Sequence, residues 1–426
     1  MKVLVIGTGA REHALVRAIA ADDGVRVVAA PGNPGTAALA ENRPVDLADP
    51  AAMGELAVEV GADLVVVGPE APLVAGAADA VRARGVPCFG PGAEAARIEG
   101  SKAFAKEVMA AAGVPTSRSA YCTEVAQVEA AMAELGAPHV VKDDGLAAGK
   151  GVIVTDDAAA ALEHARGCLA REGGAVVVEE YLDGPEVSLF CVTDGTTVVP
   201  LAPAQDFKRA LDGDAGPNTG GMGAYSPLPW APPDLVDDVL ARIAVPTVAE
   251  LARRGTPFVG VVYCGLALTP DGPKVIEFNA RFGDPETQVV LPRLATPLTG
   301  LLHAAATGTL AAHPPPEWRD EAAVTVVVAS EGYPGTVRTG DVVHGLDAAD
   351  DVPGAWTLHA GTRAEGGAVV SAGGRVVSVV GTGDTLAAAR ETAYQAVSRL
   401  SLAGSHHRSD IAERAAAGEV VLPAPA

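Results

Sequence analysis

Residues 275–288, VIEFNARFGDPETQ, combine a strand pattern with a dense group of charged side chains. The opening residues alternate between apolar and polar types, which is typical of a strand with one buried face, so Glu277 and Asn279 should share a face. Two neighbouring oxygen ligands suit a hard cation such as Mg²⁺. Arg281 follows with the same parity, and Asp284 lies in the turn beyond it. A metal site, an arginine and acids at a strand end suit phosphoryl transfer, although an edge strand with solvated polar residues would show the same spacing.

The bulk composition excludes several classes of protein. At 426 residues the chain is too long for one core, and about two to four domains are expected. No apolar run approaches the roughly 18 residues of a membrane span, and the opening MKVLVIG reads as a first strand rather than a signal peptide. The net charge of −22 disfavours binding to nucleic acid or to an anionic membrane.

The cysteine content indicates the compartment. Five cysteines, an odd number without a CxxC pair, argue against a disulfide framework and for a reduced, cytoplasmic protein. Small molecules are therefore the expected partners, with no nucleic acid and no membrane. A monomer is expected, because no long apolar repeat indicates an interface.

Residues 1–100 predict a parallel sheet with ligands at the carboxyl ends of its strands. The Gly7-x-Gly9 turn after the first strand matches the start of a dinucleotide fingerprint, but Glu12 replaces the third glycine and no acid closes the second strand. A nicotinamide site is thus disfavoured, and the glycines should let a substrate approach the helix N-terminus. The expected strands cover 3–6, 25–29, 64–67 and 86–89, with helices through residue 20 and over 76–84.

Residues 101–190 predict an α+β unit around a glycine-rich loop. Ser101 is a suitable N-cap for a helix that begins with Lys102. Lys142 ends a strand and enters the loop DDGLAAGKGV, whose backbone N–H groups and Lys150 could close over phosphates. It is not a Walker motif, because a glycine and then a strand follow its lysine. The expected elements are a helix at 102–112, a strand at 139–142, a helix at 157–171 and a strand at 175–178.

Three further segments could line a ligand site. The strand exit Glu179-Glu180-Tyr181-Leu182 could meet an adenine edge with its backbone, and Glu186 could accept from a ribose hydroxyl or be only a turn acid. The loop-rich stretch after it contains QDFKR and the glycine-dense NTGGMG. Such a glycine turn is either a surface excursion or a place where backbone approaches a ligand, and we favour the ligand.

The remaining residues predict mainly structural elements. His359 should lie in a loop, and the adjacent pair His406-His407 should point apart rather than bind a metal. The expected helices cover 234–254, 290–313 and 385–401, the expected strands 259–268, 274–279, 323–329, 342–344, 368–371 and 375–382, and the linker 314–321.

Taken in order, the motifs resemble the ATP-grasp enzymes and, more narrowly, the phosphoribosylamine–glycine ligase family. Asp143 departs from that family, where alanine is frequent, and the strand at 261–268 lacks a metal acid that many ATP-grasp relatives place there. The matching blocks are GTGAREHAL (7–15), GPEAPL (68–73), SKAF (101–104), DGLAAGKGV (144–152), EEYLDGPEVS (179–188), QDFKR (205–209), PNTGGMGAYSP (217–227) and EFNARFGDPETQ (277–288).

The resemblance implies a multidomain α/β and α+β fold with a pre-ATP-grasp domain, an ATP-grasp core and a C-terminal α+β domain. The implied divisions are 1–100 for the N-terminal substrate domain, 101–294 for the ATP-grasp domain with a lid at about 115–190, 295–321 for a helix and linker, and 322–422 for the C-terminal domain.

The resemblance also implies an ATP-dependent ligase of purine biosynthesis, with Mg²⁺ or Mn²⁺ as cofactor. It would join glycine to 5-phosphoribosylamine through glycyl phosphate. The implied catalytic residues are Arg281, Asp284 and Lys142, and the implied metal ligands are Glu277 and Asn279. The implied ATP-binding residues are Lys102, Lys142, Gly145, Gly149, Lys150, Gly151, Glu179, Glu180, Tyr181, Leu182 and Glu186. The implied substrate-binding residues are Gly9, Arg11, Glu12, Gly68, Pro69, Glu70, Asp206, Lys208, Asn218, Thr219, Gly220, Gly221 and Arg281.

Three alternative functions stay open on the sequence. Another ATP-grasp carboxylate–amine ligase or a carboxylase of nucleotide metabolism would share the ATP site and differ in the loops at 7–13 and 68–73. A nicotinamide-dependent oxidoreductase would rest on residues 1–100. A nucleotide sensor without activity is disfavoured, because the acids and Arg281 would then be superfluous.

Overall fold

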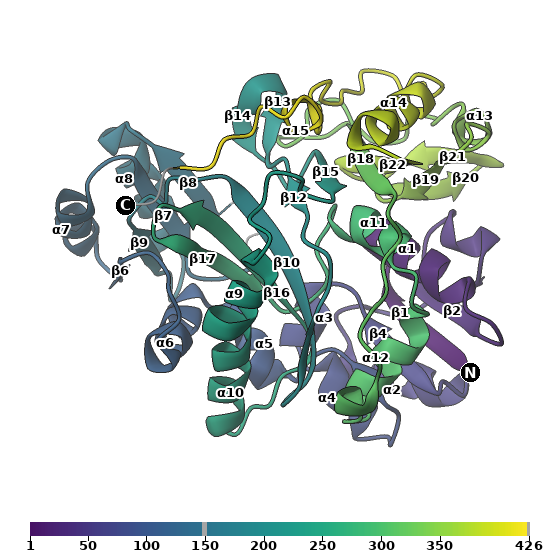
Figure 1. Ribbon diagram of the computed structural model, residues 1–426, viewed down its shortest axis with the longest axis horizontal. Helices are drawn as coiled ribbons and strands as arrows, with labels where there is room; N and C mark the ends of the chain where they lie inside the picture. Colours follow the sequence, from purple (N-terminus) through teal and green to yellow (C-terminus); the bar gives the residue numbers. More distant parts are fainter. Residues whose placement is uncertain (147–150, 424–426) are drawn as a thin grey trace.

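The computed structural model describes residues 1–146 and 151–423. It contains a parallel sheet, a central antiparallel sheet with a small lid beside it, and a C-terminal sheet (Figure 1). This is the α/β and α+β multidomain architecture that the sequence predicts. Residues from each of these parts line a common cleft.

The N-terminal sheet has the strand order β3-β2-β1-β4-β5, and all neighbouring strands run parallel. Helices α2 and α5 were not expected, although Asp49 caps α2 by accepting from the N–H groups of Ala51 and Ala52. The strands are β1 (Lys2–Gly7), β2 (Arg26–Pro31), β3 (Glu41–Asn42), β4 (Leu64–Val67) and β5 (Cys88–Phe89). The helices are α1 (Ala10–Ala20), η1 (Thr36–Ala38), α2 (Pro50–Glu59), α3 (Glu70–Val74), α4 (Ala77–Arg82) and α5 (Ala93–Gly100).

The lid is a four-stranded antiparallel sheet in the order β6-β9-β7-β8, packed against two helices. Its buried residues form a hydrophobic cluster of their own, built around Val128, Val141 and Val178. Helix α6 (Lys102–Ala112) leads into it, and Ser101 caps α6 as predicted, its Oγ accepting from the N–H of Phe104. The lid elements are β6 (Ser119–Cys122), α7 (Val125–Leu135), β7 (His139–Asp143), β8 (Val152–Thr155), α8 (Ala158–Leu169) and β9 (Val176–Glu179).

The central sheet, in the order β11-β10-β16-β17, is antiparallel throughout. The single helix expected at 234–254 is interrupted by a π-helical segment just before Pro246, whose missing N–H cannot complete a regular α-helical turn. The elements are β10 (Glu186–Asp194), β11 (Val198–Pro200), α9 (Leu235–Val239), η3 (Leu240–Ala244), α10 (Val245–Arg253), β16 (Val259–Thr269) and β17 (Gly272–Asn279).

The C-terminal sheet, in the order β12-β15-β18-β22-β19, takes two of its strands from the middle of the chain. Strand β15 pairs with β12 on one side and with β18 on the other. The strand expected at 342–344 is wrong, because this segment makes only isolated bridges, and His359 ends a strand rather than lying in a loop. The elements are β12 (Gln205–Asp206), β15 (Gly223–Ser226), β18 (Ala322–Ala329), β19 (Ala355–His359), β22 (Arg375–Gly383) and α14 (Leu386–Val397).

The other elements are short hairpins and helices. No helix within the described ranges is long and apolar enough to cross a membrane. The hairpins are β13 (Arg209–Leu211) with β14 (Ala215–Asn218), joined by η2 (Asp212–Asp214), and β20 (Thr362–Glu365) with β21 (Ala368–Ser371). The helices are α11 (Thr287–Val290), η4 (Leu291–Arg293), α12 (Leu298–Ala306), η5 (Leu310–Ala312), α13 (Leu346–Asp350) and α15 (Glu413–Ala416).

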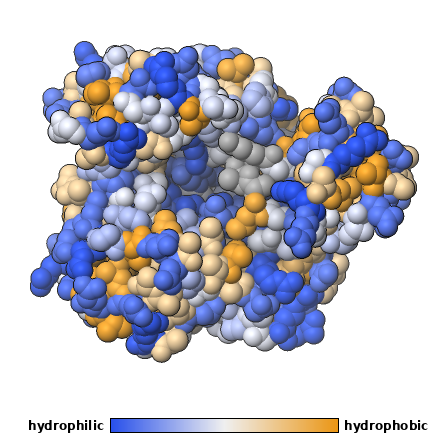
Figure 2. Space-filling model, turned by 180° about the vertical axis from the view of Figure 1, so that it is seen from behind, coloured by the Kyte–Doolittle hydropathy of each residue, from blue (hydrophilic) through white to orange (hydrophobic). Residues whose placement is uncertain are grey.

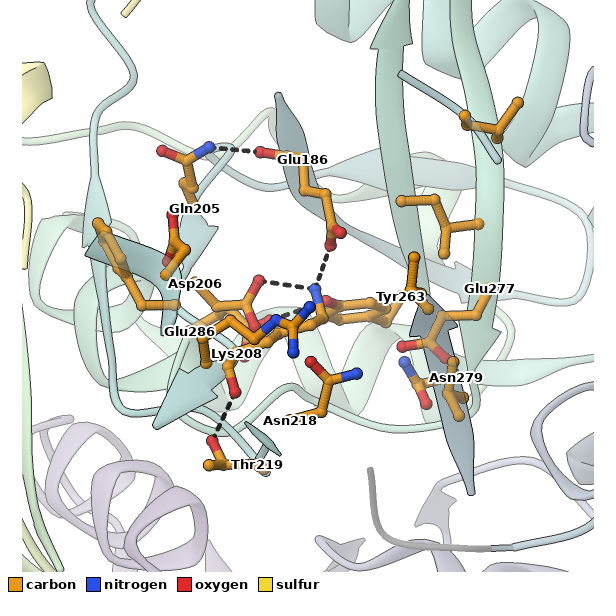
Figure 3. Close-up of a pocket in the computed structure, with 18 of the residues that line it drawn as sticks. Glu186, Gln205, Asp206, Lys208, Asn218, Thr219, Tyr263, Glu277, Asn279 and Glu286 are labelled. Atoms are coloured by element: carbon orange, nitrogen blue, oxygen red, sulfur yellow. Dashed lines mark hydrogen bonds and ion pairs between the residues drawn. The ribbon is translucent and has the colours of Figure 1, made fainter. Parts of the chain in front are cut away.

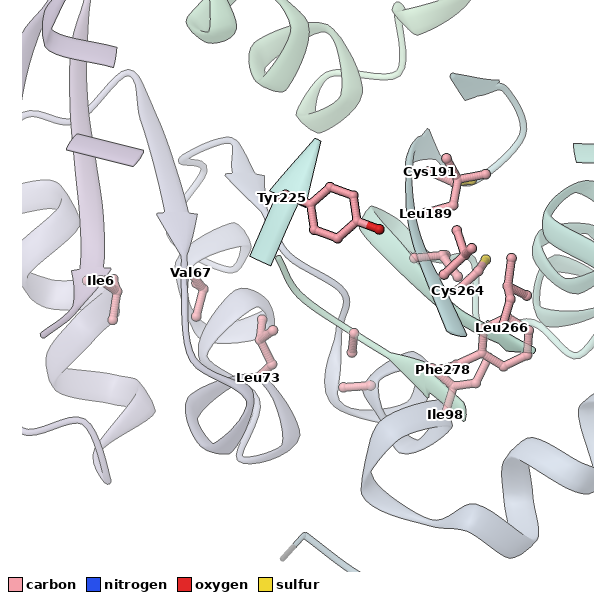
Figure 4. Close-up of a cluster of buried hydrophobic side chains, with 14 of the residues drawn as sticks. Ile6, Val67, Leu73, Ile98, Leu189, Cys191, Tyr225, Cys264, Leu266 and Phe278 are labelled. Atoms are coloured by element: carbon pink, nitrogen blue, oxygen red, sulfur yellow. The ribbon is translucent and has the colours of Figure 1, made fainter. Parts of the chain in front are cut away.

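One hydrophobic cluster runs through the molecule outside the lid. It joins Ile6 and Val67 of the N-terminal sheet to Leu266 and Phe278 of the central sheet, and Tyr225 of β15 belongs to it as well (Figure 4). Since buried apolar area is the main stabilising term, these parts hold one another in place, while the lid is stabilised by its own cluster.

Two buried histidines join helix α1 to strand β19 of the C-terminal sheet. The His359 N–H donates to His13 Nδ1 over 2.9 Å, and Asn33 Nδ2 donates to the backbone oxygens of both Thr8 (2.8 Å) and His359 (2.9 Å). Burial lowers the pKa of His13 to about 3 and that of His359 to about 4. Both rings are therefore neutral at pH 7.

These depressed pKa values predict that the protein loses stability on acidification. Between pH 6.5 and the folded-state pKa the unfolded chain binds more protons, so stability is complete above pH 6.5 and falls below it, by up to about 2 kcal/mol at pH 5 for His13. Urea unfolding midpoints at pH 7.5 and pH 5 measure this loss. The His13→Gln variant should lose part of the difference, and His313→Gln, at a site outside this contact, should keep it. An unchanged pH dependence in His13→Gln would contradict the assignment.

Candidate active site

A cleft of about 1120 Å³ lies between the N-terminal domain, α6, the lid and the central sheet. Arg375 of the C-terminal sheet and several residues of the range 408–420 close its remaining side. Hydrophilic residues surround a recess near the middle of the face in Figure 2. Most of the predicted site residues line this cleft. They are Arg11, Glu70, Lys102, Lys142, Gly145, Gly151, Glu179, Glu180, Tyr181, Leu182, Glu186, Asp206, Lys208, Asn218, Thr219, Gly220, Glu277, Asn279, Arg281 and Asp284.

Seven predicted residues remain. Two belong to the glycine-rich loop and fall outside the described residues, namely Gly149 and Lys150. The other five are described but do not line the cleft, namely Gly9, Glu12, Gly68, Pro69 and Gly221.

Strand β17 places Glu277 and Asn279 next to each other on the cleft wall, facing Asn218 (Figure 3). Burial alone would raise the pKa of Glu277. Four basic side chains hold this pKa below its usual range, namely those of Lys208, Lys142, Lys102 and Arg281. The carboxylate is therefore ionised near neutral pH.

The donor set of this wall fits a hard divalent cation. No group of three or more His, Cys, Asp or Glu side chains gathers as a metal site in the part of the chain that is described. A cation would thus take oxygens from Glu277 and Asn279 and complete its shell with phosphate and water oxygens, which is how Mg²⁺ is commonly held.

Lys142 is fixed by a buried charge cluster. Its Nζ lies 3.1 Å from Glu179 Oε2 and donates over 2.8 Å to the carbonyl of Ile276, a residue that the pairing of β17 skips. Lys106, which belongs to none of the sequence motifs, lies 3.3 Å from Glu179 Oε1. Burial lowers the pKa of Lys106 to about 8, and the two lysines hold the pKa of Glu179 below its usual range although burial opposes this. The i, i+4 spacing of Lys102 and Lys106 was the available signal.

A second charge cluster surrounds Lys208 (Figure 3). The ammonium group is paired with Glu186 and lies 3.0 Å from Asp206 Oδ1. Glu186 begins β10, so it is neither a turn acid nor free of a partner. Burial raises the pKa of Asp206, and the nearby Glu286 adds to the effect. Glu286 is itself buried and accepts from the hydroxyl of Tyr263 over 2.8 Å.

Arg281 connects the wall formed by Glu277 and Asn279 to the N-terminal domain. Its Nη2 donates to Glu99 Oε1 over 2.8 Å and to Asn279 Oδ1 over 3.4 Å, and its Nε lies 3.3 Å from Glu70 Oε2. Although burial opposes it, the two carboxylates raise the pKa of Arg281 above its ordinary value. Glu99 was not predicted, because it follows no motif and sits at the end of the unexpected helix α5.

Glu12 explains why the first glycine motif does not line the cleft. Its Oε2 accepts from the N–H of Gly9 over 2.6 Å, so the N-terminus of α1 already holds a carboxylate. A Cβ at Gly7 would lie 2.5 Å from Glu12 Cγ, and one at Gly68 would lie 2.1 Å from Glu12 Oε1. These glycines therefore leave room for the Glu12 side chain, which occupies the position that a dinucleotide pyrophosphate would take.

The backbone of the glycine-dense turn after Asn218 is held by hydrogen bonds to protein groups. The N–H of Thr219 donates to Lys208 O, that of Gly221 to Thr219 Oγ1, and that of Met222 to Phe207 O. Asp284 lines the cleft, but Gln288 Nε2 donates to its Oδ1 over 2.7 Å and Arg375 lies 3.0 Å from its Oδ2. Arg375 comes from the C-terminal sheet, and its position could not be inferred from a local pattern.

Comparisons with known proteins agree along the whole length. Three family models match, described as phosphoribosylglycinamide synthetase N domain over residues 1–99, ATP-grasp (A) domain over 100–287 and C domain over 323–414. The phosphoribosylamine–glycine ligase of Streptomyces coelicolor is 68% identical over 98% of this chain and all of its own. The enzyme of the same name from Mycobacterium tuberculosis is 58% identical over 99% of this chain and all of its own.

Two solved structures share the fold of this chain. The crystal structure of phosphoribosylamine–glycine ligase from Thermotoga maritima superposes with a TM-score of 0.83 at 31% identity, covering 96% of this chain and 100% of that one. An ADP complex of N5-carboxyaminoimidazole ribonucleotide synthetase shares the fold, with a TM-score of 0.67 at 19% identity over 93% of this chain and 96% of that one.

Proposed function

The chain belongs to the phosphoribosylglycinamide synthetase family, and from this premise we propose how its cleft carries out the family's reaction. It is an ATP-dependent ligase that joins glycine to 5-phosphoribosylamine, giving glycinamide ribonucleotide in purine biosynthesis. The convergence of Glu277 and Asn279 with Lys102, Lys142 and Arg281 in one cleft carries the mechanism below.

The reaction needs two transfers. The glycine carboxylate attacks the γ-phosphorus of ATP, forming an acyl C–O–P linkage while the bond to the β-phosphate oxygen breaks and ADP leaves. The amine nitrogen of phosphoribosylamine then attacks the acyl carbon, a C–N bond forms, and inorganic phosphate leaves with the former carboxylate oxygen. The phosphorylated carboxylate is a usable acyl donor because phosphate is a better leaving group than oxide or hydroxide.

We assign the ATP side of the cleft to α6, the lid and β17. Lys102, whose Nζ now donates to Gly145 O over 3.0 Å, and Lys142 would hold the α- and β-phosphates. Backbone groups at the exit of β9, through Tyr181 and Leu182, would meet the adenine edge. A divalent cation, Mg²⁺ or Mn²⁺, would be held by Glu277 and Asn279 and would offset charge on the β- and γ-phosphates.

Arg281 would stabilise the charge that develops on the transferred phosphoryl group, since its guanidinium contacts Asn279 and is held in place by Glu99. Lys208, Asn218 and Thr219 would contact the glycine and phosphoribosylamine. The lid, with its separate hydrophobic cluster, would close over the cleft and exclude water from the acyl phosphate.

Asp206 is better suited than Asp284 to accept the proton of the attacking amine. Each oxygen of Asp284 already has a donor, whereas among the described residues Lys208 is the one donor to the Asp206 carboxylate. The raised pKa of Asp206 also brings its basicity closer to that needed for proton transfer near neutral pH.

This role predicts an acidic limb in the pH profile of turnover. As the pH falls through the raised pKa, Asp206 becomes protonated and can no longer accept a proton, so kcat should fall. Asp206→Asn should lower kcat by about 10²-fold and flatten this limb between pH 6 and 8. The matched variant Glu186→Gln, which alters the other carboxylate on Lys208, should keep the limb. An unchanged limb in Asp206→Asn would exclude the role.

The setting proposed for this chemistry is the cytoplasm, with the protein as a monomer. All five cysteines are buried and unpaired, which suits a reducing compartment.

The proposed reaction is tested by ADP release from ATP and Mg²⁺ with glycine alone, with phosphoribosylamine generated in situ alone, and with both. ADP formed only with both, in step with glycinamide ribonucleotide, is the expected result. ADP formed without either substrate, or with bicarbonate in place of glycine, would contradict the substrate assignment and keep the ATP site.

A further inference from the structure

Arg375, the first residue of β22, reaches from the C-terminal sheet into the cleft. Its Nη1 donates to the carbonyl of Gly220, to that of Gly221 over 3.3 Å and to that of Asp284 over 2.9 Å. Its Nη2 lies 3.0 Å from Asp284 Oδ2. One guanidinium thus connects the glycine-dense turn after Asn218 to the turn at Asp284.

The glycines of the first turn are shaped around this contact. A Cβ at Gly220 would lie 3.1 Å from Arg375 Cζ, and a Cβ at Gly221, whose φ is +109°, would lie 2.4 Å from Pro285 Cδ. The two turns therefore touch through glycine backbone and leave no room for a side chain.

A second side chain of the C-terminal domain completes the arrangement. The N–H of Gly220 donates to the hydroxyl of Tyr333 over 3.0 Å. Both backbone polar groups of Gly220 are therefore engaged by the C-terminal domain. Gly374 permits this, because a Cβ there would lie 2.2 Å from the Tyr333 ring.

The ATP side of the cleft is held independently of these contacts. Lys142 is fixed by Glu179 and Ile276, and Lys102 by Gly145, all of which belong to the lid or to β17. The contacts of Arg375 with Gly220 and Asp284 lie outside this group.

We propose that Arg375 is a positioning residue through which the C-terminal domain aligns the walls for glycine and the amine substrate, leaving ATP binding to the lid and α6. The inference rests on the proposed function, since it assigns the turns at 219–221 and 283–286 to those two substrates. Misplacing a substrate wall by about 1 Å can cost on the order of 10²-fold in rate.

The test compares Arg375→Met and Arg375→Lys with wild type, and uses Arg338→Met as the matched control. Arg338 lies in the same domain, half-exposed, and pairs with Glu331 and Asp341 at the surface. We expect Arg375→Met to lower kcat/KM for phosphoribosylamine and for glycine by about 10²-fold while the Kd for ATP changes by less than about twofold. Arg375→Lys should recover only part of the loss, because the compact ammonium group of lysine cannot bridge the two turns as the planar guanidinium group of arginine does.

Tyr333→Phe gives a second test should the loss of Arg375 prevent folding. It removes only the hydroxyl that accepts from Gly220. We expect a smaller loss of kcat/KM for phosphoribosylamine and glycine, again with little change in the Kd for ATP. Wild-type kinetics in both Arg375→Met and Tyr333→Phe would overturn the inference, as would an equal loss of ATP affinity and kcat/KM.

The two hypotheses fail in different ways. Wild-type enzyme that releases ADP only with both substrates supports the proposed function whatever Arg375→Met does. Wild-type ADP release that is independent of glycine and phosphoribosylamine would overturn both.

Discussion

Replacing Glu277 with glutamine should reduce turnover by about 10³-fold, which would be the largest effect of any single change in the cleft. The substitution keeps the shape of the side chain and one oxygen, but removes the charge that would hold a divalent cation beside Asn279. A cation on transferring phosphates supplies several kcal/mol of stabilisation, and each 1.4 kcal/mol is about tenfold in rate. The Mg²⁺ concentration for half-maximal ADP release should also rise.

The measurement is a Mg²⁺ titration of ADP release at saturating ATP, glycine and phosphoribosylamine. Glu55→Gln is a matched control, because Glu55 is an exposed glutamate that pairs with Arg84 away from the cleft. Its titration should coincide with that of wild type. If Glu277→Gln also gave the wild-type titration, Glu277 would not be a metal ligand.

Arg281→Ala should lower kcat by at least about 10²-fold, the scale for removing one preorganised group that stabilises developing charge. Affinity for ATP should largely survive, because Lys102 and Lys142 remain in place with their own partners. Single-turnover ADP formation and equilibrium ATP binding measure the two quantities separately. An equal loss of both would mean that Arg281 acts only by holding the fold.

The neighbours of Arg281 provide a sharper control. Alanine at this position leaves Glu99 buried without its cation, and an unpaired buried charge is costly. The double variant Arg281→Ala, Glu99→Gln removes that charge, while the glutamine oxygen can still accept from the Ala280 N–H. We expect it to regain thermal stability and stay slow. Recovered turnover would show that the single variant failed through structure alone.

The parts that the sequence predicted well depend on neighbours within a few residues. The alternation of residues 275–279 was enough to place Glu277 and Asn279 on one wall, because a strand repeats every two residues. Ser101 could be recognised as a cap because its acceptor and the Phe104 N–H are three residues apart. The strands expected on either side of the glycine-rich loop are likewise present, as the antiparallel pair β7 and β8.

The parts that it missed depend on partners far along the chain. Arg375 contacts Gly220 across a separation of 155 residues, and no periodicity connects them. The same holds for His359, which closes a strand next to His13. Glu12 was read as a departure from a glycine fingerprint, whereas its side chain occupies the space over Gly7 and Gly68. Glycine is equally suited to admit a ligand or a side chain of the same protein, so composition could not separate the two.

The insertion of β12 and β15 into the C-terminal sheet bears on how such enzymes can be recombined. Strand β15 lies between β12 and β18, so the five-stranded C-terminal sheet is incomplete without residues from the middle of the chain. A crossover that exchanged only the residues after the linker for those of another ligase would pair β15 with a foreign strand along its whole length. The unit that must be exchanged intact is therefore the C-terminal sheet together with β12 and β15. A boundary at the linker along the chain divides this unit.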